Sequence, residues 1–160
     1  MIEERERNAA QLIASPAIRE LVIKNEITEV ERLYDFVMSF CQALSITNKS
    51  AKNICLAVEE AVVNVINYAY PHGTQGSISI MMESRQEVLK VVIKDRGKPF
   101  DPTKVAEADV SSDAEHRIIG GLGIFLIKRM MDKMGYERTP DGYNLLRLEK
   151  NINHLTTSKP

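Results

Sequence analysis

One stretch of the sequence places polar side chains at helical spacing within an otherwise apolar segment. The pattern over 50–70 predicts a helix, which ends before Pro71 and Gly73. On that helix four polar residues fall within an arc of roughly 60°, namely Asn53, Glu60, Asn64 and Asn67. The remaining surface is mostly Ala, Val, Leu and Ile. The polar stripe therefore either faces a cleft or forms the solvent-exposed edge of an ordinary amphipathic helix.

Two of these side chains suit phosphate chemistry. An Asn oxygen is a hard neutral ligand for Mg²⁺, an ion that also binds phosphate oxygens, so Asn64 is the candidate metal ligand. Glu60 lies one turn earlier on the same face and could orient or deprotonate a hydroxyl or water that attacks a γ-phosphate. Glu59 points about 100° away and suits that role less well.

A second group of candidate residues follows the apolar strand VLKVVIKD. Asp95 stands at the strand end, where its carboxylate could accept a hydrogen bond from an adenine amino group. Gly97 would let the backbone approach a flat base or adopt a positive φ. The competing interpretation is a plain surface turn, because Asp, Gly and Pro are common turn residues.

A third candidate is the glycine-rich run from Gly120 to Ile124, immediately before the helical segment FLIKRMMDKM. Glycines at a helix N-terminus expose backbone N–H groups and the positive end of the helix dipole to an anion, so Gly121, Leu122 and Gly123 are candidates for phosphate binding. The run matches neither a P-loop nor a GxGxxG fingerprint. Simple backbone flexibility would also explain these glycines.

Hydrophobic periodicity and turn residues predict the elements that position these groups. We expect a helical segment within 1–20, a strand at 21–27, helices at 28–45 and 50–70, a hairpin of 76–83 and 87–95, a lid at 101–120, a helix at 121–134 and a closing hairpin of 136–138 and 144–150. This order predicts an α+β fold, a two-layer α/β sandwich with helices on one face of a mostly antiparallel mixed sheet. The domain should span 21–152, between an extension at 1–20 and a disordered tail at 153–160.

Composition narrows the function classes. The 160 residues suit one domain, and 21 basic against 22 acidic side chains leave no field that would attract nucleic acid or an anionic membrane. Neither a secretory signal nor an apolar run long enough to span a bilayer is present, so we expect a cytoplasmic protein. Cys41 and Cys55 lie in apolar helical patterns and are expected to be buried thiols, not metal ligands or disulfide partners.

Together, three segments resemble a known family. They are similar to the N, G1 and G2 boxes of GHKL ATPases, and they read AVEEAVVNVINYAYPHG, VIKDRGKPFDP and IIGGLGIFLIKRMMDKMGYER. The resemblance is closest to bacterial anti-sigma factor serine kinases and related anti-sigma regulatory proteins. The resemblance covers about residues 20–150. It implies a histidine-kinase-like ATPase domain that holds ATP between helices and sheet under a lid.

Position by position, the resemblance implies that Glu60 is the general base and that Asn64 is the Mg²⁺ ligand. Asp95 would recognise adenine with support from Gly97, and Asn67 would belong to the nucleotide site. The phosphates would meet the backbone of Gly121, Leu122 and Gly123. One departure is Pro99, which stands where the superfamily often has a second glycine, so the shape of that loop should differ.

The resemblance also implies ATP and Mg²⁺ as cofactors, and an ATP-dependent protein serine/threonine kinase that phosphorylates an anti-anti-sigma partner and regulates a sigma factor. The alternative is a non-catalytic, nucleotide-regulated module that binds the sigma factor. A stand-alone ATPase or sensor-kinase fragment fits less well, because no phosphoacceptor-histidine helix precedes the domain. A homodimer is expected through the helix at 28–45 and the opening strand.

Overall fold

The computed structural model describes residues 17–105 and 121–157. These residues form a five-stranded sheet in the order β1-β2-β3-β5-β4, in which every neighbouring pair is antiparallel. The strands are β1 (Ala17–Lys24), β2 (Ser77–Arg85), β3 (Val88–Asp95), β4 (Lys133–Arg138) and β5 (Asn144–Asn151). The predicted α+β class is confirmed, although the described sheet is antiparallel throughout and not mixed.

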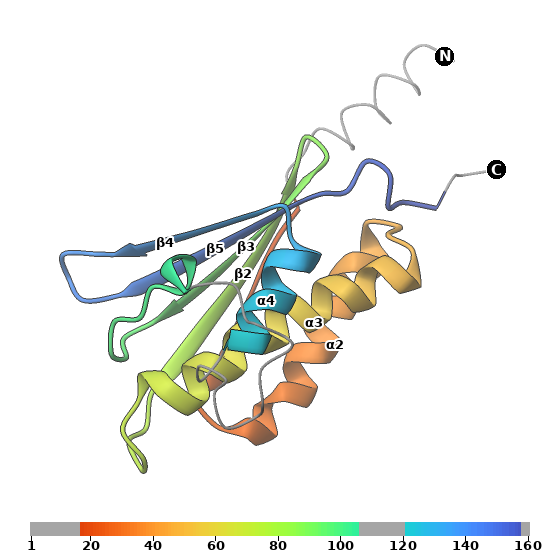
Figure 1. The fold of residues 1–160 in the computed structure, drawn as a ribbon. Helices are drawn as coiled ribbons and strands as arrows, with labels where there is room; N and C mark the ends of the chain where they lie inside the picture. The colour runs from red at the N-terminus through yellow and green to blue at the C-terminus, as the bar shows by residue number, and fades with distance from the viewer. Residues whose placement is uncertain (1–16, 106–120, 158–160) are drawn as a thin grey trace, which may run out of the picture.

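Three α-helices in the described part of the chain cover one face of this sheet (Figure 1). They are α2 (Val30–Ala43), α3 (Asn48–Asn64) and α4 (Gly121–Met130), with shorter helical turns η1 (Ile27–Glu29), η2 (Val65–Ala69, a π-helix) and η3 (Pro102–Lys104). Helix α3 packs against both α2 and α4. Thr47 caps its N-terminus, since its side-chain oxygen accepts a hydrogen bond from the Ser50 N–H.

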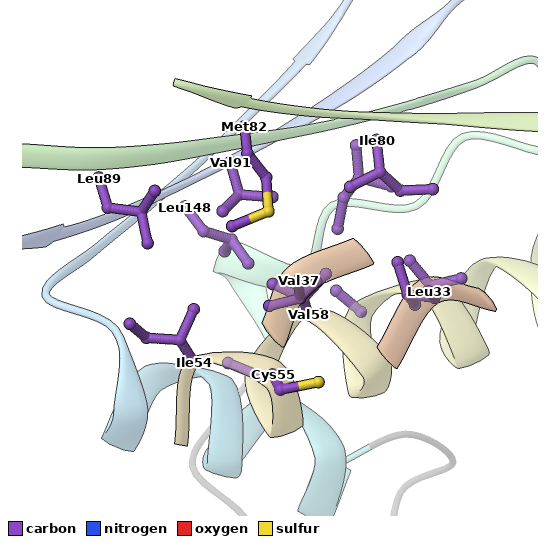
Figure 2. Packing of buried hydrophobic residues seen from close by; sticks show 14 of the residues in the cluster. Leu33, Val37, Ile54, Cys55, Val58, Ile80, Met82, Leu89, Val91 and Leu148 are labelled. Carbon is purple, nitrogen blue, oxygen red and sulfur yellow. The ribbon is translucent and has the colours of Figure 1, made fainter. Parts of the chain in front are cut away.

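The core lies between the helices and the strands (Figure 2). Alternate residues of β2 and β3 are buried, as expected for strands with one covered face. The labelled core side chains in Figure 2 are Leu33, Val37, Ile54, Cys55, Val58, Ile80, Met82, Leu89, Val91 and Leu148. Each large aliphatic side chain buried here contributes about 1.5–3 kcal/mol to folding. The packing fixes α3, which carries the candidate residues Glu60 and Asn64.

Several predicted boundaries were wrong, among them the start of the closing hairpin, which lies at Lys133 and not at 136. The first strand spans 17–24, not 21–27, because pairing with β2 begins at Ala17 opposite Ser84. The third helix ends at Met130, not 134, because the Asp132 N–H donates to the Glu149 carbonyl (2.8 Å) and the chain joins the sheet there. The expected helix within 1–20 and most of the lid at 101–120 lie outside the described residues.

The C-terminal segment was also predicted wrongly as disordered from 153. Thr156 forms a β-bridge with Ile46. Around it, the Thr47 N–H donates to the Leu155 carbonyl (2.7 Å) and the Thr157 N–H donates to the Ser45 carbonyl (2.8 Å). Residues 153–157 therefore lie against the turn between α2 and α3. None of the described helices combines the length and the apolar character that crossing a bilayer requires.

Candidate functional site

A cavity of about 50 Å³ lies where the end of α3, η2, the loop after β3, α4 and the β4–β5 hairpin meet. Its described wall is mainly apolar, with Ala61, Val65, Tyr68, Ala69, Phe100, Pro102, Ile127, Tyr136 and Leu146. Four polar residues complete the wall, namely Asn64, Asp95, Lys98 and Asn144. An apolar cavity with a few converging polar groups is typical of a small-molecule site.

Asp95 is the buried acceptor of this cavity. Its side chain is only 5% exposed, and its Oδ1 accepts hydrogen bonds from the Gly97 N–H (2.7 Å) and from Asn144 Nδ2 (2.9 Å). The sheet register explains the second bond, because Asp95 on β3 stands opposite Asn144 on β5. Among the described residues, the hydrogen bonds to this carboxylate all reach Oδ1. Oδ2 is therefore left for a donor within the cavity.

Asn144 was missed by the sequence analysis. It occupies the first position of the buried alternation that continues through Leu146 and Leu148. Its Oδ1 accepts from the Tyr136 hydroxyl (2.7 Å) and from Arg138 Nη1 (2.9 Å), while its Nδ2 also donates to the Gly97 carbonyl (3.1 Å). A polar residue in the buried register of a strand was the available signal, since a buried amide needs partners.

Gly97 is required for a close approach of two backbone segments. A Cβ atom at this position would lie 2.6 Å from both the Cβ and the carbonyl oxygen of Ala69. The following N–H, from Lys98, donates to that same carbonyl (2.6 Å). Of the two reasons predicted for this glycine, a positive φ is wrong, and its approach to a flat base stays a prediction; the close approach in the structure is to the end of η2.

The predicted polar stripe divides into two parts. Asn64 lines the cavity, whereas Asn53 and Asn67 are exposed and Tyr68 lines the described wall instead of Asn67. For Asn67 the cause is η2, because a π-helix has more residues per turn than the regular α-helix from which the stripe was projected. The predicted contribution of Asn67 to a nucleotide site therefore has no support from its position.

Helix α4 lies against the face of α3 that carries Glu60. A Cβ atom on Gly123 would stand 2.5 Å from Glu60 Oε2 and 3.7 Å from Asn64 Nδ2. Gly121 and Gly123 are buried and Leu122 is 44% exposed. Neither these three residues nor Glu60 lies in the described wall of the cavity. The start of α4 thus lies next to Glu60 and next to Asn64, which lines the cavity.

Glu59 occupies a different environment from Glu60. Burial raises the pKa of Glu59, the neighbouring Cys55 thiol lowers it, and the Glu60 carboxylate raises it. Burial also raises the pKa of Cys55 to about 12 and that of Cys41 to about 11, so the predicted assignment of both cysteines as buried thiols is confirmed. The Glu59 side chain therefore interacts with a core thiol.

The described residues contain no group of three or more His, Cys, Asp or Glu side chains that could hold a metal ion. The amide oxygen of Asn64 beside the cavity fits Mg²⁺ only where phosphate oxygens and water supply the remaining ligands. Mg²⁺ bound in this way is common in phosphate-transfer sites. The donor set of the described residues is therefore compatible with a nucleotide-borne ion.

Comparison with known proteins gives a consistent family. Residues 23–150 match the model of the histidine kinase-like ATPase domain. A serine-protein kinase RsbW from Halalkalibacterium halodurans is 31% identical over 115 residues, covering 69% of this chain and 68% of the relative. RsbW from Staphylococcus aureus is 34% identical over 90 residues, covering 53% of this chain and 57% of the relative. The chain thus spans little more than half the length of the second relative.

Two solved structures share the fold. One holds the RsbU and RsbW domains of a Mycobacterium tuberculosis protein, with a TM-score of 0.61 at 11% identity over 84% of this chain and 32% of that one. The other is a SiaB–SiaC complex from Pseudomonas aeruginosa, with a TM-score of 0.52 at 17% identity over 94% of this chain and 96% of that one. At these identities the likeness establishes the architecture alone.

Proposed function

The chain belongs to the histidine kinase-like ATPase domain family, and from this premise we propose that it is an ATP-dependent serine kinase that phosphorylates an anti-anti-sigma partner and regulates a sigma factor. One observation carries the proposal: Asn64 and Asp95 face the same cavity, while Glu60 and the start of α4 lie beside it. The serine-protein kinase names of the relatives support the substrate class.

The base of ATP fits the apolar part of the cavity. Asp95 Oδ2 would accept a hydrogen bond from the adenine amino group, between walls that include Tyr68 and Phe100. The loop that carries Lys98, Phe100 and Pro102 forms part of the wall, so we expect its side chains to rearrange when the nucleotide enters.

The phosphates would extend along α3 toward α4. Asn64 would hold Mg²⁺ through its amide oxygen, and the backbone N–H groups at the start of α4 would bind phosphate oxygens. When bound, Mg²⁺ neutralises negative charge on the phosphates. Glu60 accepts the proton of the attacking serine hydroxyl as that oxygen bonds to the γ-phosphorus, and the β,γ-bridging oxygen leaves with ADP.

Partner binding and assembly follow from the same family. We infer a cytoplasmic protein that binds a sigma factor and an anti-anti-sigma protein. We expect no nucleic-acid or membrane partner, because the formal net charge of the chain is only −1. A homodimer is supported by β1, an edge strand with exposed Ile18 (56%) and Val22 (53%). Sedimentation equilibrium at tens of micromolar should give the mass of two chains; a single-chain mass would exclude the dimer.

A second function is favoured by the position of Glu60, which packs against Gly123 and does not line the described cavity wall. A chain in which this carboxylate never reaches a hydroxyl would bind ATP and a sigma factor without transferring phosphate. In that case nucleotide would act by shifting the population of a partner-binding conformation. The two functions share the ATP site and differ only in the transfer step.

Two measurements on the full chain test the proposal. Titration calorimetry with ATP and Mg²⁺ should give a Kd of about a micromolar or weaker, because the loop beside the cavity must reorganise. Labelled ATP, with a candidate anti-anti-sigma protein, should yield that protein phosphorylated on serine. Absence of nucleotide binding by the folded chain would exclude both functions. Binding of ATP and partner without transfer would leave only the non-catalytic module.

A further inference from the structure

The side chain of Asn144 faces the cavity but has no free hydrogen-bonding capacity. We propose that Asn144 is the positioning residue that orients Asp95, and that this orientation gives the site its preference for a 6-amino purine over a 6-oxo purine. The inference rests on the proposed function, because it assumes that the cavity holds the base of ATP. It adds the group that makes the Asp95 carboxylate selective.

The hydrogen bonds of Asn144 account for its whole amide. Such an amide has two N–H donors and two acceptor lone pairs. The donors go to Asp95 Oδ1 (2.9 Å) and the Gly97 carbonyl (3.1 Å), and the lone pairs accept from the Tyr136 hydroxyl (2.7 Å) and Arg138 Nη1 (2.9 Å). With all four positions in use, Asn144 has nothing left with which to contact a base.

The partners also fix which way the amide points. A guanidinium can only donate, so the atom that faces Arg138 must be the oxygen. The carbonyl of Gly97 can only accept, so the atom that faces it must be the nitrogen. A flipped amide would oppose donor to donor and acceptor to acceptor. Asn144 is therefore held in one orientation by groups from its own hairpin and from the loop after β3.

This fixed amide determines where Asp95 points. The terminal torsion of an Asp side chain is intrinsically broad, so a carboxylate held by one donor can rotate. Here Oδ1 receives two donors, the backbone N–H of Gly97 and Nδ2 of Asn144. Oδ2 is consequently directed into the cavity as a fixed acceptor. A fixed acceptor favours an amino group at purine position 6 and repels a carbonyl oxygen there.

The experiment compares ATP with inosine triphosphate, whose base carries a carbonyl in place of the 6-amino group and a hydrogen on N1. The Kd of each nucleotide, with Mg²⁺, is measured for the full-length wild type, Asn144→Asp and Asn144→Ser. Asn144→Asp keeps the shape but replaces the donor to Asp95 by an acceptor. Asn144→Ser is shorter and admits water. Asn151→Asp makes the same change at the exposed far end of β5 and serves as the control.

Wild type and Asn151→Asp should bind ATP on the order of tenfold to a hundredfold more tightly than inosine triphosphate. In both Asn144 variants, with folding checked by thermal denaturation, that ratio should fall to about threefold or less, while the affinity for inosine triphosphate stays within about threefold of wild type. Equal loss of affinity for both nucleotides, or an unchanged ratio in either folded variant, would overturn the inference alone. A wild type that binds neither nucleotide would overturn the proposed function and this inference with it.

Discussion

The carboxylate of Glu60 lies against Gly123, where a Cβ atom would stand 2.5 Å from Oε2. The contact joins α3 to the first turn of α4, and it involves the carboxylate that we propose as the general base. Because the obstructing atom is the end of a flexible side chain, the contact concerns the placement of Glu60 more than the stability of the fold.

Gly123→Ala should therefore fold but transfer phosphate poorly. The added methyl group displaces the Glu60 carboxylate, and a misplacement of about 1 Å can cost about a hundredfold in rate. Helix stability should not suffer, since Ala is a better helix former than Gly. Transfer from labelled ATP should fall at least tenfold while the Kd for ATP changes less than about threefold. Gly135→Ala, where a Cβ meets nothing within 4 Å, should behave as wild type.

Glu60→Gln should separate binding from transfer. The amide keeps the size and much of the hydrogen bonding of Glu60 but cannot accept the proton of the attacking hydroxyl. Transfer should fall by about 10² to 10⁴ with ATP affinity preserved. Glu59→Gln is the matched control, because that carboxyl lies beside Cys55 and should leave transfer near wild type. If phosphate transfer is lost in Glu59→Gln but kept in Glu60→Gln, then Glu59 and not Glu60 is the general base.

Asn64→Ala should weaken both nucleotide binding and turnover. Without this amide oxygen Mg²⁺ loses its protein ligand, and affinity for ATP should fall at least about tenfold. When Mg²⁺ is chelated, wild type and variant should bind ATP almost equally, because the lost interaction passes through the ion. Asn53→Ala, on the exposed part of the same helix, is the control. A difference that persists after chelation would contradict the metal role.

Gly97→Ala should destabilise the fold. Here the added Cβ meets the Ala69 carbonyl at 2.6 Å, and backbone cannot move aside as a side chain end can. Overpacking of this kind typically costs about 1–3 kcal/mol. Urea denaturation should show that loss in the free energy of unfolding, with Gly135→Ala unchanged. A Gly97→Ala protein as stable as wild type would mean that the loop and η2 can separate without cost.

The two buried thiols should make stability fall at alkaline pH. Burial raises the pKa of Cys41 from 9.0 to about 11 and that of Cys55 to about 12, so the unfolded chain loses these protons first. Their contribution is complete below about pH 9 and declines above it by up to about 1.4 kcal/mol per pH unit for each thiol. Urea denaturation under reducing conditions from pH 8 to 10.5 should show a smaller decline for Cys55→Ala than for wild type.

Local pattern was sufficient for much of the fold. The alternation in β2 and β3 and the 3.6-residue periodicity of α2 and α3 each report a single covered face, so the layer order could be predicted. The end of α4 could not, because Met131 to Met134 still favour a helix. Pairing with β5 takes over at Asp132, whose N–H donates to the Glu149 carbonyl, and the hydrophobic pattern of 131–134 does not show that the hairpin begins so early.

The site shows the same division. Asp95, Gly97 and Asn64 follow from residue type and position, and the structure brings them together around the cavity or its supporting loop. Asn144 depends on a register between strands that are 49 residues apart in sequence, which a local pattern does not contain. The place of Asn67 was predicted for a regular α-helix, but this part of the chain is the π-helical turn η2, so the side chain points elsewhere.

That turn has a consequence for how the gene can vary. A π-helix takes about one residue more per turn than an α-helix, so deleting one residue from Val65–Ala69 would restore regular helix and leave the chain beyond it in nearly the same orientation. The Ala69 carbonyl could then still accept from the Lys98 N–H, and the Tyr70 hydroxyl could still accept from the Arg96 N–H, which it contacts at 3.1 Å. Among homologues that share these contacts, loss of one residue from this segment should therefore be tolerated better than an insertion into it.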